Sequence, residues 1–170
     1  MKGQAEIVVF ILLFVIGLSL FIISTFWSRN IFKQNTDLAK IELARKTLID
    51  LDKNIKDLIK FGGSRNIDYN LDGTIELIDD PEHNKIEIKT EVSINLPEKW
   101  VNLTTDSSYI REKLEGNILR IQLIYPESSY KVEFFTEGPK LAKPETIRIE
   151  KNSTYVVDST TVIKIKVAFI

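Results

Sequence analysis

The chain has 170 residues, a formal net charge of −1 and a pI of about 5.9. This length accommodates one folded domain and a connecting helix. The nearly balanced charge argues against nucleic acid as a partner, because phosphate binding needs clustered lysine and arginine. Cysteine is absent, which excludes disulfides, thiolate metal sites and a cysteine nucleophile.

The first long segment, residues 7–27, reads IVVFILLFVIGLSLFIISTFW and contains no charged residue. A helix of about 20 apolar residues spans a bilayer, so we expect a membrane to be one partner of this chain. A cleaved secretory signal fits less well, because its apolar core is shorter and residues 24–28 make a poor cleavage site. A plain N-terminal anchor and a pilin-type leader are the other two interpretations.

Lys2-Gly3-Gln4-Ala5-Glu6 stands directly before this apolar segment. The arrangement resembles the class III signal peptide of archaeal type IV pilins, and the resemblance is confined to the segment before residue 30. It implies that a prepilin peptidase cleaves after Gly3, so that residues 1–3 are a leader peptide and Gln4 becomes the new N-terminus. It also implies self-assembly through the N-terminal helix, with the pilus assembly machinery as a partner.

Glu6 has two interpretations. By the resemblance, it is an assembly residue that pairs with the terminal amine of a neighbouring subunit. Pilins of this family usually carry an acidic residue at the fifth mature position, where this chain has Val8, and Glu6 would be the third mature residue. The alternative is a helix-start carboxylate, which the helix dipole stabilises by about 0.3–1 kcal/mol.

The side of the membrane on which the rest of the chain lies is not set by charge. Arg29 and Lys33 follow the apolar segment and only Lys2 precedes it, which by itself weakly favours a cytoplasmic C-terminal part. We nevertheless expect an extracellular location, because the downstream composition is that of a surface domain and because of the leader resemblance.

A second helical pattern covers residues 37–61, within an amphipathic continuation over 29–62. Its apolar residues are spaced alternately three and four apart, as in a heptad seam: Ile41, Ala44, Leu48, Leu51, Ile55 and Leu58. Gly62-Gly63 then ends the helix. Either one helix runs from about residue 5 to 61, or Asn35 or Thr36 caps a second helix. The seam packs on the following domain or forms a coiled coil between subunits, and both can hold in a filament.

Residues 63–170 change to a period of two, which predicts a β-rich extracellular head domain. We expect turns at 72–73 and 115–117, and a bulge or crossing near Thr90 in the second strand. The expected strands cover 74–78, 85–96, 118–125, 130–136, 146–150, 155–157 and 161–170. The predicted fold class is α+β: a long N-terminal transmembrane or filament-core helix over 4–28 with its continuation, followed by an antiparallel β-sandwich-like head.

Chemistry-bearing residues are few, and we expect neither an enzyme nor a cofactor. His83 stands in Asp-Asp-Pro-Glu-His-Asn, which fits a polar hairpin tip better than a metal site because the spacing of a calcium loop is missing. Asn102 and Asn152 begin two N-glycosylation sequons, each of which arises easily by chance. Trp100 is either an exposed binding aromatic or a ring buried against the sheet.

These features predict a structural subunit of an archaeal type IV pilus-like surface filament, serving adhesion or as a surface appendage. The subunit would be a single-pass membrane protein before assembly and part of an extracellular filament afterwards. The alternative is a single-span envelope protein in which Gly3 is not cut. Its extracellular β domain would bind an S-layer or an archaellum-stator partner.

Overall fold

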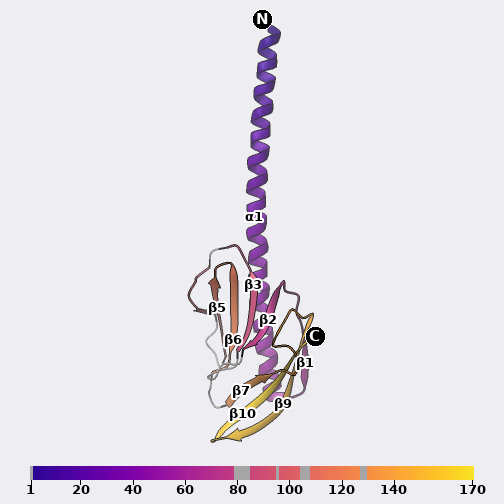
Figure 1. The fold of residues 1–170 in the computed structure, drawn as a ribbon, viewed down its shortest axis with the longest axis vertical. Helices are drawn as coiled ribbons and strands as arrows, with labels where there is room; N and C mark the ends of the chain where they lie inside the picture. Colours follow the sequence, from indigo (N-terminus) through magenta and orange to yellow (C-terminus); the bar gives the residue numbers. More distant parts are fainter. Residues whose placement is uncertain (1, 79–84, 95, 104–107, 127–129) are drawn as a thin grey trace. The chain divides into compact units, whose positions relative to one another are not determined.

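A computed structural model describes residues 2–78, 85–94, 96–103, 108–126 and 130–170, with side chains from Ile7 onward. The chain consists of one long N-terminal helix followed by two β-sheets, an α+β arrangement with a β-rich head, as predicted (Figure 1). Two compact units make up the chain, residues 1–37 and residues 38–170.

Helix α1 is continuous over Lys2–Phe61, so the single-helix alternative is confirmed and no cap interrupts it at residue 35 or 36. Its hydroxyl side chains bond to their own helix: Ser19, Thr25 and Thr36 donate to carbonyl oxygens four residues earlier at 2.8, 2.8 and 2.9 Å. The Thr36 hydroxyl therefore bonds within a continuing helix instead of capping a new one.

The part of α1 within the second unit buries the predicted seam. Ile41 is 2 % exposed, and Ala44, Leu48, Leu51, Ile55 and Leu58 are fully buried. Gly62 and Gly63 then take positive φ angles of 70° and 90°, and the Gly62 amide donates to the Leu58 carbonyl at 2.8 Å. This left-handed ending is the one that glycine permits at lowest cost.

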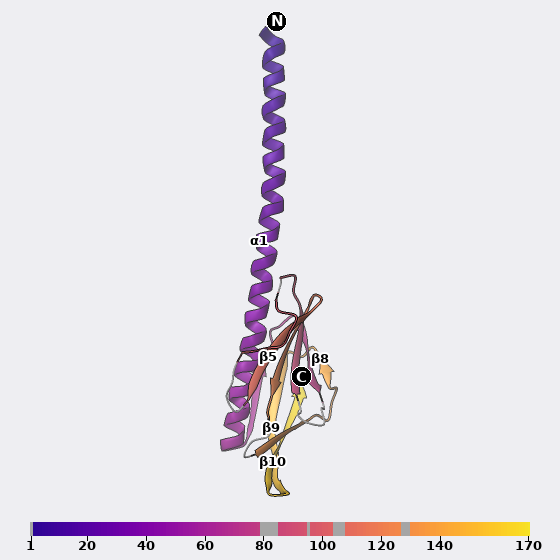
Figure 2. The ribbon, with the colours of Figure 1, turned by 90° about the vertical axis from the view of Figure 1, so that its left-hand side faces the viewer.

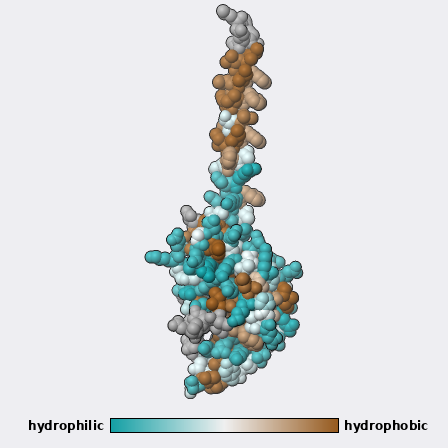
Figure 3. All heavy atoms as spheres, in the orientation of Figure 1, coloured by the Kyte–Doolittle hydropathy of each residue, from teal (hydrophilic) through white to brown (hydrophobic). Residues whose placement is uncertain are grey.

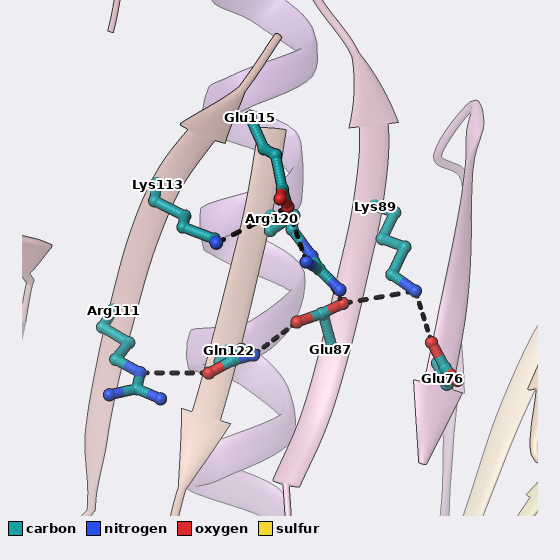
Figure 4. A network of polar contacts seen from close by, with 8 residues as sticks. All are labelled: Glu76, Glu87, Lys89, Arg111, Lys113, Glu115, Arg120 and Gln122. Atoms are coloured by element: carbon teal, nitrogen blue, oxygen red, sulfur yellow. Dashed lines mark hydrogen bonds and ion pairs between the residues drawn. The ribbon is translucent and has the colours of Figure 1, made fainter. Parts of the chain in front are cut away.

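The larger sheet has six strands in the order β4-β5-β6-β3-β2-β8, and every neighbouring pair is antiparallel. Its strands are β2 (Gly73–Ile78), β3 (Lys85–Glu91), β4 (Val101–Asn102), β5 (Tyr109–Glu115), β6 (Ile118–Ile124) and β8 (Leu141–Ala142). The segment of α1 that belongs to this unit lies behind β5, β6 and β3 (Figure 4), and seam and sheet residues share one core.

The smaller sheet has four strands in the order β1-β9-β10-β7. They are β1 (Ser64–Asp68), β7 (Tyr130–Phe135), β9 (Thr146–Val157) and β10 (Thr160–Phe169). The β7–β10 pair is parallel, whereas the other two pairs are antiparallel. Apolar residues on one face join the same core as the helix seam, including Ile147, Ile149, Ile165 and Val167. Figure 2 shows β9 and β10 as a long hairpin.

Three expectations about the strands need correction. The strand expected over 85–96 ends at Glu91, because Val92 leaves the ladder and donates its amide to the Asn117 carbonyl in the β5–β6 turn. The strands expected over 146–150 and 155–157 are one strand, β9, because a register shift opposite Lys164 and Ile165 absorbs an extra residue. No bulge occurs at Thr90, because β3 keeps a regular register with both β2 and β6. The short or polar strands β1, β4, β5 and β8 were not predicted.

Candidate functional site

The most distinctive surface of the first unit is the apolar segment of α1 from Ile7 to Trp27. Large hydrophobic side chains are exposed on every side of the helix, with Phe10 and Phe21 each 71 % exposed and Trp27 68 % exposed. The most apolar window of this helix has a mean hydropathy of 3.1 and is not buried at all. Figure 3 shows the segment as an almost unbroken hydrophobic surface.

A helix that is apolar all round needs an apolar environment on all sides, which lipid or a bundle of like helices supplies. By length and composition α1 can cross a membrane. Phe26 and Trp27 close the segment, and the charged Arg29 follows. Aromatic residues at this position are typical of the membrane–water interface, where an apolar ring meets polar headgroups.

The candidate processing and assembly residues lie at the start of the same helix. The backbone of Gly3, Gln4 and Glu6 is helical, because α1 begins at Lys2. The side chains of residues 1–6 are outside the described part of the structure. Cleavage after Gly3 and the pairing of Glu6 therefore remain predictions.

The two sequon asparagines are both exposed and lie in the second unit. Asn102 is in β4, opposite Arg111 of β5, and its sequon threonine at position 104 is outside the described residues. Asn152 is in β9 at the register shift, and Ser153 and Thr154 after it are exposed. Both side chains can be reached from solvent, which a glycan-transfer enzyme requires.

Trp100 is neither fully exposed nor fully buried. The guanidinium carbon of Arg111 lies 4.4 Å from the centroid of its ring and the Lys113 ammonium lies 5.1 Å from it. Cations at these distances are attracted by the ring quadrupole, so the ring already has partners within the chain. His83 lies outside the described residues. Within the described ones, no group of three or more histidine, cysteine, aspartate or glutamate side chains is placed to hold a metal ion.

A network of charged side chains covers the face of the six-stranded sheet that points away from α1 (Figure 4). At its centre the Glu87 side chain is fully buried, although Lys85 and Lys89, its neighbours on the same face of β3, are only partly buried. Its carboxylate accepts from Arg120 Nε at 3.0 Å and from the Gln122 amide, and Lys89 Nζ lies 3.4 Å away.

The same network continues to both sides of Glu87. Lys89 also pairs with Glu76 at 2.5 Å, and this hydrogen bond raises the pKa of Lys89. Arg120 also pairs with Glu115 at 2.6 Å. Because each charge in this row is balanced by a neighbour, the face offers structural support more than a binding site for a charged ligand.

Two polar clusters join α1 to the strands inside the second unit. Arg45 pairs with Glu112 of β5 through two hydrogen bonds, of 2.8 and 2.5 Å. Asp52 accepts from Ser108 at 2.7 Å and from the Tyr125 hydroxyl, and its other oxygen pairs with Lys56 at 2.7 Å. Sequence reasoning missed the contacts that Arg45 and Asp52 make with the strands. The available signal was Glu112 itself, an acid on the apolar side of a strand.

Comparisons with family models, with curated proteins and with solved structures found no match for this chain.

Proposed function

We propose that this protein is a structural subunit of an archaeal type IV pilus-like surface filament. The single observation that supports this most is the helix segment 7–27, which is apolar around its whole circumference and exposed throughout. The resemblance of residues 2–6 to a class III signal peptide adds the processing step. In this proposal α1 anchors the precursor in the membrane, and after cleavage it packs with copies of itself.

The physical basis is that lipid and a helical bundle are interchangeable environments for such a segment. Lipid tails are as apolar as leucine side chains, so transfer from one to the other changes hydrophobic burial little. Packing between helices then decides the assembly, and a head-to-tail interface that does not close generates a filament. Pairing of Glu6 with a neighbouring terminal amine would neutralise a carboxylate that is costly in an apolar bundle.

The second unit supports separate roles for the two parts of α1 in this proposal. The heptad seam from Ile41 to Leu58 is already buried against the strands of its own domain. It is therefore not free to form a coiled coil between subunits while this domain stays folded. The contacts between subunits that α1 makes are therefore formed by the exposed segment before the seam. The head forms the surface of the filament.

A second candidate is an envelope protein that stays anchored by α1 with Gly3 uncut. The observation that favours it is the position of Glu6, two residues before the place where pilins usually carry their acid, with Val8 at that place. In this alternative the β domain faces outward and binds an S-layer or an archaellum-stator partner, and the apolar helix remains in lipid.

Mass spectrometry of the native N-terminus separates the two candidates. A chain that starts at Gln4 and forms the main component of filaments seen by electron microscopy supports the pilin-like subunit. An intact Met1 or Lys2 in dispersed, membrane-bound chains supports the anchor instead.

A matched pair of glycine variants sharpens this test. Gly3→Val should block processing and leave the precursor in the membrane, because the residue before the cleaved bond is changed. Gly138→Val is the control, because Gly138 lies in the head outside the helix segment proposed to assemble, and an added Cβ there meets only the Thr136 hydroxyl at 3.8 Å. Normal filaments from the Gly3 variant would contradict the proposal.

A further inference from the structure

The hairpin of β9 and β10 is longer than the strands beside it. Strand β1 pairs with β9 only from Thr146 to Glu150, and the Lys151 amide then donates to the Gly63 carbonyl at 3.2 Å. From Asn152 to Val157 no described residue pairs with this side of β9. We call these six residues the open edge; the hairpin end that carries them can be followed in Figures 1 and 2.

The open edge has the composition of a strand that is ready to pair. It reads Asn-Ser-Thr-Tyr-Val-Val and contains no charge, proline or glycine. Tyr155, Val156 and Val157 are 36, 67 and 47 % exposed. Exposed edges are usually blocked by charges, proline or covering segments, because their free amides and carbonyls recruit other strands.

The turn at the end of the hairpin fixes which backbone groups point to the open side. Asp158 and Ser159 have φ angles of 46° and 69°, as in a two-residue type I′ turn. Such a turn is closed by a hydrogen-bonded pair, here Val157 and Thr160. Bonding direction alternates along a strand, so the amides and carbonyls of Thr154 and Val156 point to the open side.

We propose that the open edge pairs antiparallel with the open edge of a second copy of this chain, about a two-fold axis at Tyr155. In this register Thr154 of each copy lies opposite Val156 of the other, and these are the residues whose backbone groups point outward. Tyr155 lies opposite its counterpart as a non-hydrogen-bonded pair, the arrangement that brings facing side chains closest.

Charge complementarity supports a second copy as the occupant. Lys151 and Asp158 flank the open edge with opposite charges. In the proposed register Asp158 of one copy lies opposite Asn152 of the other, one residue from Lys151, whose ammonium also donates to the Ile59 carbonyl of its own chain at 3.0 Å. The residues between these two charges are uncharged. Insertion of the hairpin tip into lipid is disfavoured by Asp158, because an ionised carboxylate is expensive in an apolar medium.

An edge of six residues buries little surface, so we expect pairing to be weak between freely diffusing chains. Two chains anchored in one membrane meet at a much higher effective concentration, which favours pairing. That step rests on the membrane anchoring proposed above, whereas the register follows from β9 and its turn alone.

Site-directed disulfide formation tests the register directly, because the chain has no cysteine of its own. The full chain is placed in lipid nanodiscs large enough for two copies and is oxidised mildly. Tyr155→Cys should form dimers about tenfold faster than Asn117→Cys, a cysteine in an exposed turn, because cysteines facing each other across a ladder have a high effective concentration.

A mixed pair of variants tests the same register independently. Ser153→Cys and Val157→Cys should cross-link when the two chains are mixed, and each should cross-link poorly alone. Equal rates for Tyr155→Cys and Asn117→Cys, or equal cross-linking of the two variants alone and mixed, would overturn the proposal. These measurements need no filament, so their failure leaves the proposed function untouched, and a failure of filament assembly leaves them unaffected.

A proline variant separates edge pairing from folding. Val156→Pro removes an amide that points to the open side and keeps the bonds between β9 and β10. In the Tyr155→Cys background it should abolish the fast cross-linking while the thermal melting of the second unit stays unchanged. Undiminished cross-linking in this variant would count against the proposal.

Discussion

Arg45 of α1 and Glu112 of β5 form a two-point ion pair inside the second unit, at 2.8 and 2.5 Å. The Glu112 side chain is only 6 % exposed and lies between Ile110 and Leu114 on the apolar side of its strand. The hydrogen bond to Glu112 raises the pKa of Arg45, which therefore remains charged. We expect the pair to fix the rotation of the helix segment against the sheet, which apolar packing alone specifies less sharply.

Removing one member of this pair should destabilise the head strongly. In Arg45→Met the Glu112 carboxylate stays buried without its cation, and we expect a loss of about 3 kcal/mol in the free energy of unfolding. Urea unfolding of the full chain in detergent, followed by circular dichroism, measures this loss.

Two further variants make that experiment decisive. Lys46→Met changes the exposed neighbouring cation and should shift the free energy of unfolding by less than about 0.5 kcal/mol. The double variant Arg45→Met with Glu112→Met removes both charges and should recover most of the lost stability. If Arg45→Met and Lys46→Met behave alike, the ion pair has no structural role.

The network on the outer sheet face contains two glutamates that share one arginine, and we expect their removal to lower the stability of the head by different amounts. Arg120 pairs with Glu87, whose side chain is fully buried, and with Glu115, whose side chain is 58 % exposed. Glu87→Ala should cost about 2–4 kcal/mol, because it leaves a cavity and unpaired donors from Arg120 and Gln122. Glu115→Ala should cost less than about 1 kcal/mol, since exposed pairs contribute little. Parallel thermal melts would reveal the difference, and equal melting temperatures would refute it.

Gly73, at the start of β2, leaves no room for a larger side chain. A Cβ at this position would lie 2.5 Å from the Lys89 carbonyl oxygen and 3.1 Å from the Thr90 Cβ, so the two strands would have to separate. We expect Gly73→Ala to cost about 1–3 kcal/mol. Gly138→Ala is the control, because its nearest neighbour would be the Thr136 hydroxyl at 3.8 Å. Comparable denaturant midpoints for the two variants would contradict this account.

The sequence predicted the parts of the fold that depend on local periodicity. The seam from Ile41 to Leu58 was placed correctly because a spacing of three and four leaves only one helix face for the core. The helix end at Gly62-Gly63 was equally local, since positive φ angles there favour glycine. The apolar segment 7–27 was evident from composition alone.

Other parts depend on partners that are distant in the sequence. The parallel pairing of β7 with β10 is set by how the two sheets share a core, and no local pattern reports it. Strand β9 looked interrupted because Lys151, Asn152 and Ser153 are polar, and only the register shift against β10 makes it continuous. Glu87 occupies a position that reads as solvent-facing, and the long side chains of Lys89 and Arg120 pair with it there.

Two buried tyrosines make the stability of the head sensitive to alkaline pH. Burial, followed by the nearby charge of Asp52, raises the pKa of Tyr125, whose hydroxyl donates to that carboxylate. Burial alone raises the pKa of Tyr69, whose hydroxyl has no hydrogen-bond partner in the described part of the chain. The neutral forms are therefore favoured in the folded state. Their contribution is fully present below about pH 10, the unfolded-state pKa of tyrosine, and is lost as the pH rises towards the raised folded values.

We expect the free energy of unfolding to fall above pH 10 by about 1.4 kcal/mol per pH unit for each of the two tyrosines. Tyr125→Phe removes one of these groups and should lessen the slope by about half, although it also lowers stability at neutral pH by breaking the bond to Asp52. Urea unfolding of both chains between pH 8 and pH 11 measures the slopes. Identical slopes would show that Tyr125 ionises as easily in the folded head as in the unfolded chain.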